Sequence, residues 1–178
     1  TFFKFLCLLL VLVFVLYGFS FRTDEINMDN FRYLLNFAGS GGDTAENLKT
    51  IYFDNNDDNK YALVRGDLAV VNSSGSSVYT LTGVRQSVDT SLKLDCPAVL
   101  ASAKYMYVYD LGGNQLVVKS ALETVHTIGY NYPIREAAAT DSGVFAVVSA
   151  EKTSRSAIYV YDERFRVVYD CTYGSLYT

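Results

Sequence analysis

The sequence is most informative at first for what it lacks. Its 178 residues include no tryptophan, one histidine, two prolines and three cysteines. A lone histidine, with no cysteine or carboxylate pattern at ligand spacing beside it, does not provide a zinc site of the usual kind. A formal net charge of −4 leaves no basic stripe to neutralise phosphates. We therefore predict no zinc centre and no binding to nucleic acid.

Aromatic and other hydrophobic residues dominate what is present. Half of the sequence is hydrophobic, only 19% is charged, and there are 15 tyrosines and 11 phenylalanines. Aromatic and β-branched side chains suit a pleated, half-buried surface, so this composition favours strands over helices.

An uninterrupted apolar run without charge, FLCLLLVLVFVLYGFSF, covers Phe5 to Phe21 between Lys4 and Arg22. Such a run is at the short end of what spans a hydrocarbon core about 30 Å thick. A cleaved signal peptide is the alternative, but the residues after the run offer no small-x-small cleavage site. We predict an uncleaved transmembrane signal-anchor helix over residues 1–22.

The charges that flank this run predict its orientation. Lys4 precedes the run, whereas Asp24 and Glu25 follow it closely. Because positive residues prefer the cytoplasmic side, we expect a single-pass protein of the cell membrane whose C-terminal domain lies outside the cytoplasm.

Residues 23–47 are predicted to connect the anchor to a folded body. Apolar residues in Ile26 to Phe37 fit one stripe of a short juxtamembrane helix. The stretch AGSGGDTAEN that follows is polar and rich in glycine, so we expect a flexible linker there.

Residues 48–178 repeat a strand–turn–strand pattern. Three hairpins, LAVVN–SSGS–VYTL, MYVYD–LGGN–QLVV and IYVYD–ERF–RVVYD, begin at Leu68, Met106 and Ile158, 38 and then 52 residues apart. A further hairpin, EAAAT–DSG–VFAVVS, precedes the third and gives the last unit four strands. Spacing of about 40 to 50 residues is typical of four-stranded propeller blades. We predict an incomplete β-propeller of about three blades, with a β-sandwich as the alternative.

Closure of a propeller needs at least about four blades. The first residue is Thr rather than Met, and the last segment, YDCTYGSLYT, carries no closing signal. We therefore expect the sequence to be a piece of a longer protein.

The apolar anchor, the hairpins YMYVYDLGGNQLVV and SAIYVYDERFRVVYD and the stretch ATDSGVFAVVS together carry a resemblance. Residues 5 to 178 resemble a bacterial family of membrane-anchored β-propellers of unknown function, similar in repeat style to quinoprotein-like and WD40-like propellers. The resemblance implies a closed propeller outside the cell membrane. It transfers no catalytic residue.

Two short motifs point to binding sites and fit simple turns better. Asp54, Asn56 and Asp58 alternate as calcium ligands do, but Asn59 and Arg65 occupy the places of the required glycine and glutamate. We interpret this stretch as a polar turn. RGD at 65–67 matches an integrin-recognition tripeptide, yet it bridges two predicted strands, so we interpret it as a tight turn.

The remaining reactive side chains also have ordinary structural explanations. His126 has no GxSxG nucleophile motif to accompany it and is expected to be packed or at a rim. A disulfide between Cys96 and Cys171 is permitted outside the cytoplasm, and two free thiols are the alternative. Most of the tyrosines in the repeats are expected to pack between blades. They are Tyr105, Tyr107, Tyr109, Tyr159, Tyr161 and Tyr169.

No catalytic, cofactor-binding or metal-binding residue is therefore predicted, and no cofactor. We expect a non-enzymatic, membrane-tethered binding or scaffolding module for a protein, peptide or cell-envelope glycan. One alternative is a quinoprotein-like or glycosidase-like enzyme with catalytic residues in further blades; the absence of tryptophan weakens the quinoprotein version. Another is a structural spacer. Any ligand contact is expected in the divergent turns LGGN and ERF.

Overall fold

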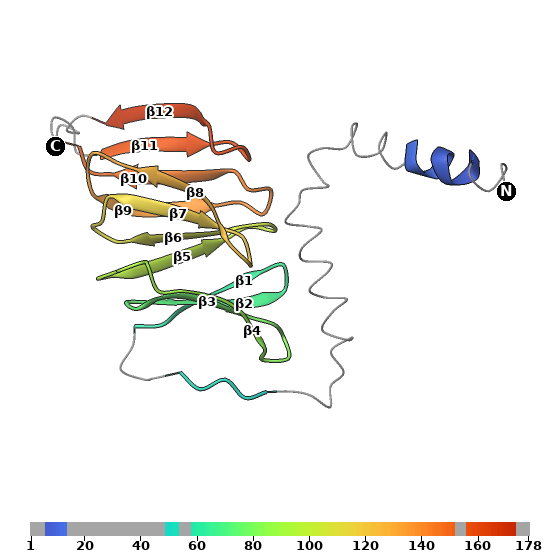
Figure 1. Cartoon of the computed structure of the whole chain (residues 1–178). Coiled ribbons are helices and arrows are strands. Elements are labelled where there is room, and N and C mark those ends of the chain that lie inside the picture. The colour runs from blue at the N-terminus through green and yellow to red at the C-terminus, as the bar shows by residue number, and fades with distance from the viewer. Residues whose placement is uncertain (1–5, 14–48, 54–57, 152–155, 174–178) are drawn as a thin grey trace. The chain divides into compact units, whose positions relative to one another are not determined.

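A computed structural model describes residues 6–13, 49–53, 58–151 and 156–173 (Figure 1). Its internal contacts divide the chain into two units, Thr1–Asp43 and Thr44–Thr178. In the first unit, residues 6–13 form a helix. Within the part of the chain that the structure describes, no helix has the length and apolar character that crossing a membrane requires. Most of the predicted anchor, the juxtamembrane helix and the linker fall outside the described residues.

The second unit consists of three four-stranded antiparallel sheets, each a meander in chain order. We name them the first blade (β1–β4), the second blade (β5–β8) and the third blade (β9–β12). The strands are β1 (Lys60–Val64), β2 (Asp67–Asn72), β3 (Gly75–Tyr79), β4 (Arg85–Asp89), β5 (Pro97–Ala101), β6 (Met106–Asp110), β7 (Gln115–Lys119), β8 (Thr124–Gly129), β9 (Ile134–Ala139), β10 (Phe145–Ser149), β11 (Ser156–Tyr161) and β12 (Val167–Tyr173).

The three blades stack face to face, with the second blade between the other two (Figure 1). The first strands of the blades lie together, because β5 contacts both β1 and β9. This is the predicted all-β fold, an incomplete β-propeller, and the prediction is confirmed. The alternative of a two-sheet sandwich does not describe three stacked sheets.

The repeat is more regular than the sequence suggested. The second strands of the blades begin at Asp67, Met106 and Phe145, 39 residues apart each time. The four strands predicted for the last unit, EAAAT, VFAVVS, IYVYD and RVVYD, correspond to β9–β12. Measuring the repeat from IYVYD was wrong, because it belongs to β11, a third strand, whereas MYVYD is β6, a second strand. The similar letters reflect general strand preferences, because β6 is buried whereas β11 is mostly half-buried, and they do not mark equivalent positions.

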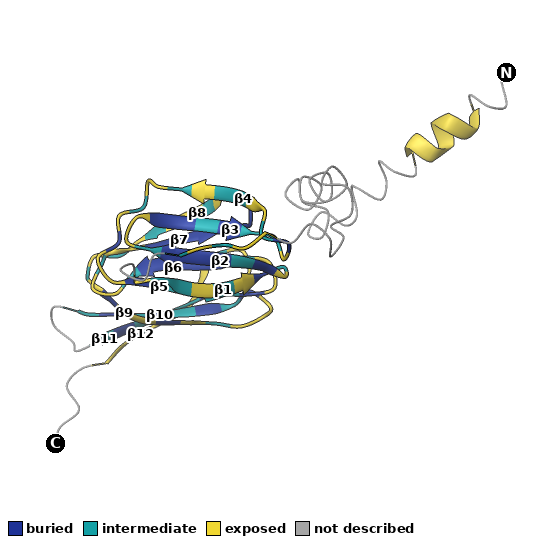
Figure 2. Ribbon diagram, turned by 90° about the horizontal axis from the view of Figure 1, so that it is seen from below, coloured by how far each residue is buried: buried dark blue, intermediate teal, exposed yellow. Residues whose placement is uncertain are grey.

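The second and third blades differ in how far their strands are buried. In the second blade, β6 and β7 are buried on both faces, since a blade covers each side. In the third blade, β10 alternates between buried and half-buried residues, and β12 is almost wholly exposed (Figure 2). The face of the third blade that packs on the second joins a core cluster, which comprises Tyr107, Tyr109, Leu116, Val118, Ile134, Ala137, Phe145, Val147 and Tyr161.

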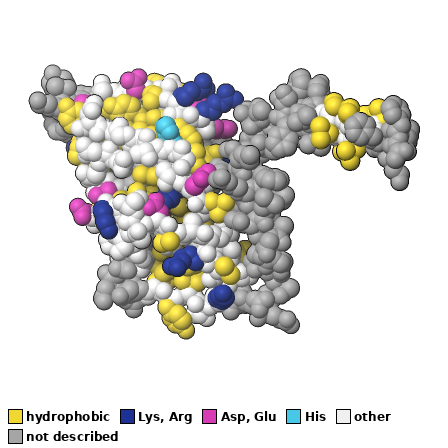
Figure 3. Space-filling model, viewed as in Figure 1, with side chains coloured by type: hydrophobic (Ala, Val, Ile, Leu, Met, Phe, Trp, Pro, Cys, Tyr) yellow, Lys and Arg dark blue, Asp and Glu magenta, His cyan; other side chains and the backbone are white. Residues whose placement is uncertain are grey.

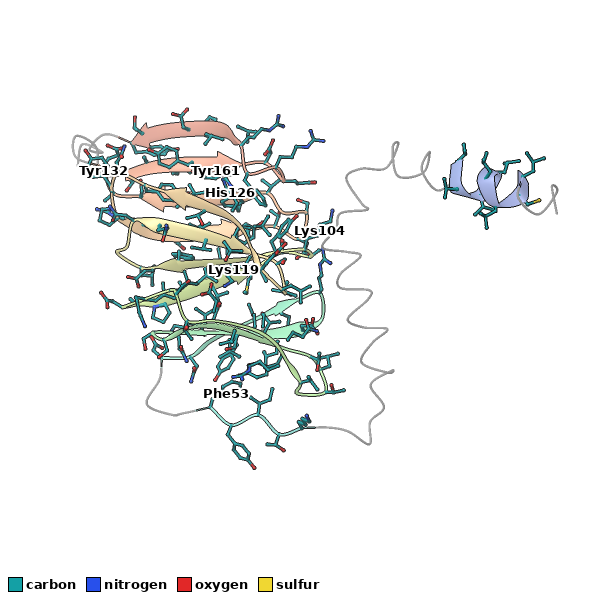
Figure 4. The ribbon with its side chains drawn as sticks, in the orientation of Figure 1. Phe53, Lys104, Lys119, His126, Tyr132 and Tyr161 are labelled. Carbon is teal, nitrogen blue, oxygen red and sulfur yellow. The ribbon has the colours of Figure 1, made fainter. Side chains whose placement is uncertain are left out.

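A partly buried ion pair joins the first and second blades. Lys119 on β7, labelled in Figure 4, is almost fully buried. It donates a hydrogen bond to the Asp89 carboxylate on β4. Nearby, the Ser87 hydroxyl donates to the Ala121 carbonyl at 2.8 Å. Polar contacts therefore link the first and second blades at this boundary.

The other face of the first blade is partly covered by the chain itself. The Phe53 ring packs edge-on against Tyr61 and Tyr79, with centroid distances of 5.6 and 6.1 Å. The Lys49 amide donates to the Thr82 carbonyl at 2.8 Å. Residues 49–53 therefore serve as a partial cap on this blade.

Candidate functional site

Three blade turns share one backbone design. The turns span residues 80–84, 140–144 and 162–166, and each has the same two backbone hydrogen bonds. The amide of the first residue donates to the carbonyl of the fifth, and the amide of the fourth donates to the carbonyl of the first. All six bonds are 2.8–3.0 Å long. A turn of this kind needs a left-handed residue at its fourth position. Glycine provides it in two turns, as Gly83 (φ 82°) and Gly143 (φ 101°).

The third turn places a phenylalanine where the others have glycine. Phe165 adopts a φ of 62°. For a residue with a side chain, this conformation costs about 1 to 2 kcal/mol relative to the right-handed region. Bulky residues in it are rare and occur preferentially at functional sites. Contacts made by the Phe165 ring must therefore offset the strain of its backbone.

The ring packs across the boundary between the second and third blades. It stacks on the His126 imidazole with centroids 5.4 Å apart and planes 10° from parallel. It meets the Tyr105 ring edge-on, also at 5.4 Å. We call Tyr105, His126 and Phe165 the aromatic cluster. Phe165 and Tyr105 are half-buried and His126 is exposed, so the cluster reaches the surface (Figure 3).

Neighbouring turns hold the aromatic cluster in place. Tyr105 closes the turn between β5 and β6, where its amide donates to the Ser102 hydroxyl oxygen at 3.1 Å. In the same turn, the Ala103 amide donates to the Asp141 carbonyl of the third blade at 3.0 Å. The edge where these turns meet is therefore one connected surface, which we call the turn edge.

A buried hydroxyl strengthens this connection. Tyr107 donates a hydrogen bond from its hydroxyl to the Gly143 carbonyl at 3.0 Å. Burial raises the pKa of the Tyr107 phenol above its usual range. The second and third blades are thus tied by backbone, side-chain and ring contacts at the same edge.

Charges on the turn edge are of both signs. Lys104 and Arg164 are exposed beside the exposed carboxylates of Asp141 and Glu163 (Figure 4 labels Lys104). Within the third-blade turn, the hydrogen bond from Arg166 lowers the pKa of Asp162, whose carboxylate also accepts from the Arg164 amide at 3.0 Å. A surface with charges of both signs suits a ligand that also carries both signs of charge, and not a polyanion.

A second group of aromatic residues lies at the opposite edge of the same boundary. The Tyr130 and Tyr159 rings are 5.8 Å apart. The Tyr130 hydroxyl is buried near the Tyr161 hydroxyl, but it makes no hydrogen bond of good geometry among the described residues. Burial raises the pKa of this phenol. The group is packed between blades and offers less surface than the aromatic cluster.

The structure assigns places to several residues singled out in the sequence. The RGD turn consists of Arg65 and Gly66, both with positive φ, while Asp67 begins β2 and is buried. Of the calcium-like stretch, residues 54–57 fall outside the described residues; Asp58 pairs with Lys60 at 2.7 Å.

The cysteines and tyrosines also have defined positions. Cys96 is exposed before β5 and Cys171 is half-buried in β12; both thiols are free. Of the repeat tyrosines, Tyr107, Tyr109 and Tyr161 are buried, as expected for packing between blades. Tyr105 and Tyr159 are half-buried and Tyr169 is exposed. No group of three or more potential metal ligands occurs among the described residues.

The sequence predicted ligand contacts in the LGGN and ERF turns without singling out Phe165. LGGN lies between β6 and β7, where the Gly112 amide donates to the Ile134 carbonyl at 2.8 Å, and is not part of the turn edge. The signal was present in TLTGV, TDSGV and DERFR, which align once their shared turn is known. A phenylalanine at the glycine position is the unusual feature. His126 was considered singly, and only the fold shows that it stacks on this ring.

Comparisons with known proteins add a family and two distant structures. A model described as a family of unknown function (DUF5711) matches residues 43–172. No curated protein matches the chain. Among solved structures, Hsv2 from Kluyvelomyces marxianus aligns at 10% identity and a TM-score of 0.41, covering 64% of this chain and 38% of Hsv2.

A candidate exported protein from Bacteroides fragilis (BF0058) aligns at 10% identity with a TM-score of 0.41, covering 75% of this chain and 41% of its own. The chain therefore spans about two fifths of the length of either structure. Likenesses this low carry no argument about function.

Proposed function

We propose a function for this chain, which belongs to a family of unknown function (DUF5711). It is a membrane-tethered, extracytoplasmic binding or scaffolding module. Its contact surface is the turn edge of the second and third blades. The partner is a protein, peptide or cell-envelope ligand. The observation that carries this proposal is Phe165, a bulky residue kept at a φ of 62° on a surface turn.

The chemistry of the turn edge favours a protein or peptide partner. Aromatic and arginine side chains are enriched at the centres of protein interfaces, where they contribute most of the binding energy. The aromatic cluster provides rings that are already ordered by mutual contact, so binding loses little side-chain entropy. Lys104, Asp141, Glu163 and Arg164 surround it with both signs of charge, which suits selection among partners.

The membrane part of the proposal is supported by the apolar run from Phe5 to Phe21 and its flanking charges. Protease treatment of intact cells tests it. Digestion of the propeller in intact cells is expected. Protection until the cells are lysed would contradict the extracytoplasmic placement.

Site-specific photocrosslinking tests the contact surface. A photoreactive residue is placed at Glu163 and, as a matched control, at Leu81, the same position of the equivalent first-blade turn. Crosslinking in cells to a discrete partner at 163 but not at 81 is expected. Equal crosslinking at both positions, or none at 163, would refute the proposed surface.

The variant Phe165→Gly separates binding from folding. It removes the ring and relieves the backbone strain, so its stability is expected to change by less than about 1 kcal/mol, because lost packing and relieved strain offset each other. Phe165→Ala keeps the strain and is expected to be less stable than Phe165→Gly. Both are expected to lose the crosslink at 163.

A further inference from the structure

The last strand of each blade has one free edge. Among the described residues, β4, β8 and β12 each pair with a neighbouring strand on one side only (Figure 1). Because the first strands of the blades lie together, these last strands lie at the rim, and the stacking of blades through their faces leaves their edges free. A free edge presents backbone N–H and C=O groups that readily pair with another strand. Proteins usually protect such an edge with charged residues, proline or short length.

The edge of β12 has the least of this protection. β12 has seven residues, against five in β4 and six in β8. Its only charged residue is Asp170, and it contains no proline. Four of its side chains are large, hydrophobic and 52–60% exposed, namely Val167, Val168, Tyr169 and Tyr173. β4 has one such side chain and β8 has none, so β12 is the edge at which a further strand is most favoured.

Only part of β12 is regular enough to pair along its free edge. The register between β11 and β12 shifts at Val160 and is unbroken from Tyr169 to Tyr173. A shift of this kind bends the strand and disrupts the ladder locally. A further strand would therefore pair with Tyr169–Tyr173, whose middle residue is Cys171.

This regular part of β12 is complementary to itself. In a symmetric antiparallel pair, one residue lies opposite its own copy, and the flanking residues pair twice. With Cys171 at the centre, Tyr169 lies opposite the second copy's Tyr173, which makes two aromatic pairs. Asp170 then lies opposite Thr172, whose hydroxyl can donate a hydrogen bond to a carboxylate. Centring the pair on Asp170 instead would place two carboxylates directly opposite each other, which is destabilising.

We propose that β12 is a homodimerisation edge. The β12 strands of two copies pair antiparallel about an axis at Cys171, and the two third blades join into one continuous sheet. A second copy fits better than an unrelated strand, because it supplies all of the matching residues in one register. The strand pair by itself covers a small area, so a reversible, concentration-dependent dimer is expected. This inference goes beyond the function proposed for the turn edge and does not depend on it.

Disulfide crosslinking tests the pairing. Residues opposite each other in an antiparallel pair have Cα atoms about 4.5 to 5.5 Å apart, a distance that a disulfide can bridge. Single-cysteine forms of the 178-residue chain keep Cys171 or, as one control, the exposed Cys96. A second control places Val88→Cys in the cysteine-free chain, because Val88 lies on the edge strand β4 and is 54% exposed. Each purified form is oxidised with copper phenanthroline in detergent, and linked dimers are followed by non-reducing electrophoresis.

Cys171 is expected to form the linked dimer at least about tenfold faster than either control, because pairing holds the two thiols opposite each other. Equal rates at the three positions would overturn the proposal, and so would the absence of a dimer linked through Cys171. In the cysteine-free chain, a mixture of Tyr169→Cys and Tyr173→Cys forms is expected to crosslink faster than either form by itself. Faster linkage of either form by itself would contradict the register.

Substitution of Thr172 gives an independent readout. Thr172→Lys places a cation opposite the second copy's Asp170, whereas Thr172→Asp places a second carboxylate there. Each contact occurs twice, so the dissociation constant of the dimer is expected to fall several-fold for Thr172→Lys and to rise several-fold for Thr172→Asp. Sedimentation velocity measures both constants. Because Thr172 is exposed, both variants are expected to keep the far-ultraviolet circular dichroism of the wild type. A shift of both constants in the same direction, or of neither, would overturn the proposal.

Discussion

The Lys119 ammonium group donates a hydrogen bond to the Asp89 carboxylate across the boundary between the first and second blades. The Lys119 side chain is only 6% exposed and that of Asp89 25%. Removing one partner of a buried pair leaves the other charge without compensation, which is far more costly than losing a surface ion pair.

Asp89→Ala is therefore expected to destabilise the propeller by about 2 to 3 kcal/mol, because Lys119 would remain buried without its partner. Urea unfolding followed by circular dichroism measures the change. Asp95→Ala, at an exposed position before β5, is the matched control, with an expected change below about 0.5 kcal/mol. Similar values for the two variants would show that the ion pair contributes little.

The same pair predicts an acid dependence of stability. The hydrogen bond from Lys119 lowers the pKa of Asp89 to about 2, below the value of about 3.9 in an unfolded chain. Because the folded pKa is the lower one, the contribution of this carboxylate is fully present above about pH 4 and is lost as the pH falls towards 2. The stability difference between the wild type and Asp89→Asn is expected to shrink over that window. A constant difference from pH 6 to pH 2 would contradict this assignment.

Two tyrosine-to-phenylalanine changes are expected to act in opposite directions. Tyr107→Phe removes a buried hydrogen bond to the Gly143 carbonyl and is expected to cost about 1 kcal/mol. Tyr130→Phe removes a buried hydroxyl that lies near the Tyr161 hydroxyl but makes no hydrogen bond of good geometry among the described residues, so it is expected to be neutral or stabilising by up to about 1 kcal/mol. Thermal unfolding of the two variants side by side measures the difference. Equal destabilisation would show that the Tyr130 hydroxyl is satisfied in solution.

Two glycines test how the hairpins of the first blade are built. Gly66 has a φ of 86° and open space around its Cα, whereas a Cβ on Gly75 would lie 2.0 Å from the Asp89 carbonyl oxygen. Gly66→Ala is expected to cost about 1 kcal/mol, from backbone strain alone. Gly75→Ala is expected to cost more than about 2 kcal/mol, because β4 must also move away. Chemical denaturation of both variants compares them, and the opposite order would show that β4 moves with little cost.

The regular features of the fold were predictable because they depend on local residue types. Short runs such as KYALV and MYVYD, separated by glycine and polar turns, predict antiparallel hairpins in any context. Their recurrence predicts stacked blades, since a single four-stranded sheet cannot bury both of its faces. The length of the repeat was misjudged, because β6 and β11 have similar letters but different places in their blades.

The candidate site was less predictable for a physical reason. His126 and Phe165 are far apart in the sequence, and their parallel stacking depends on how the second and third blades pack. The pairing of Lys119 with Asp89 likewise depends on one blade lying against another. The residues next to Lys119 and Asp89 in the sequence give no sign that the two side chains pair.

The sequence by itself determined that the chain builds repeated antiparallel β-blades after an apolar N-terminal run, because strand and turn preferences and hydrophobic length are local properties. Only the tertiary structure decided which side chains meet between blades. It brought a strained Phe165 against His126 and Tyr105, and it paired Lys119 with Asp89 across a blade boundary. Contacts of that kind depend on how sheets stack in space, which is not a local property of the chain.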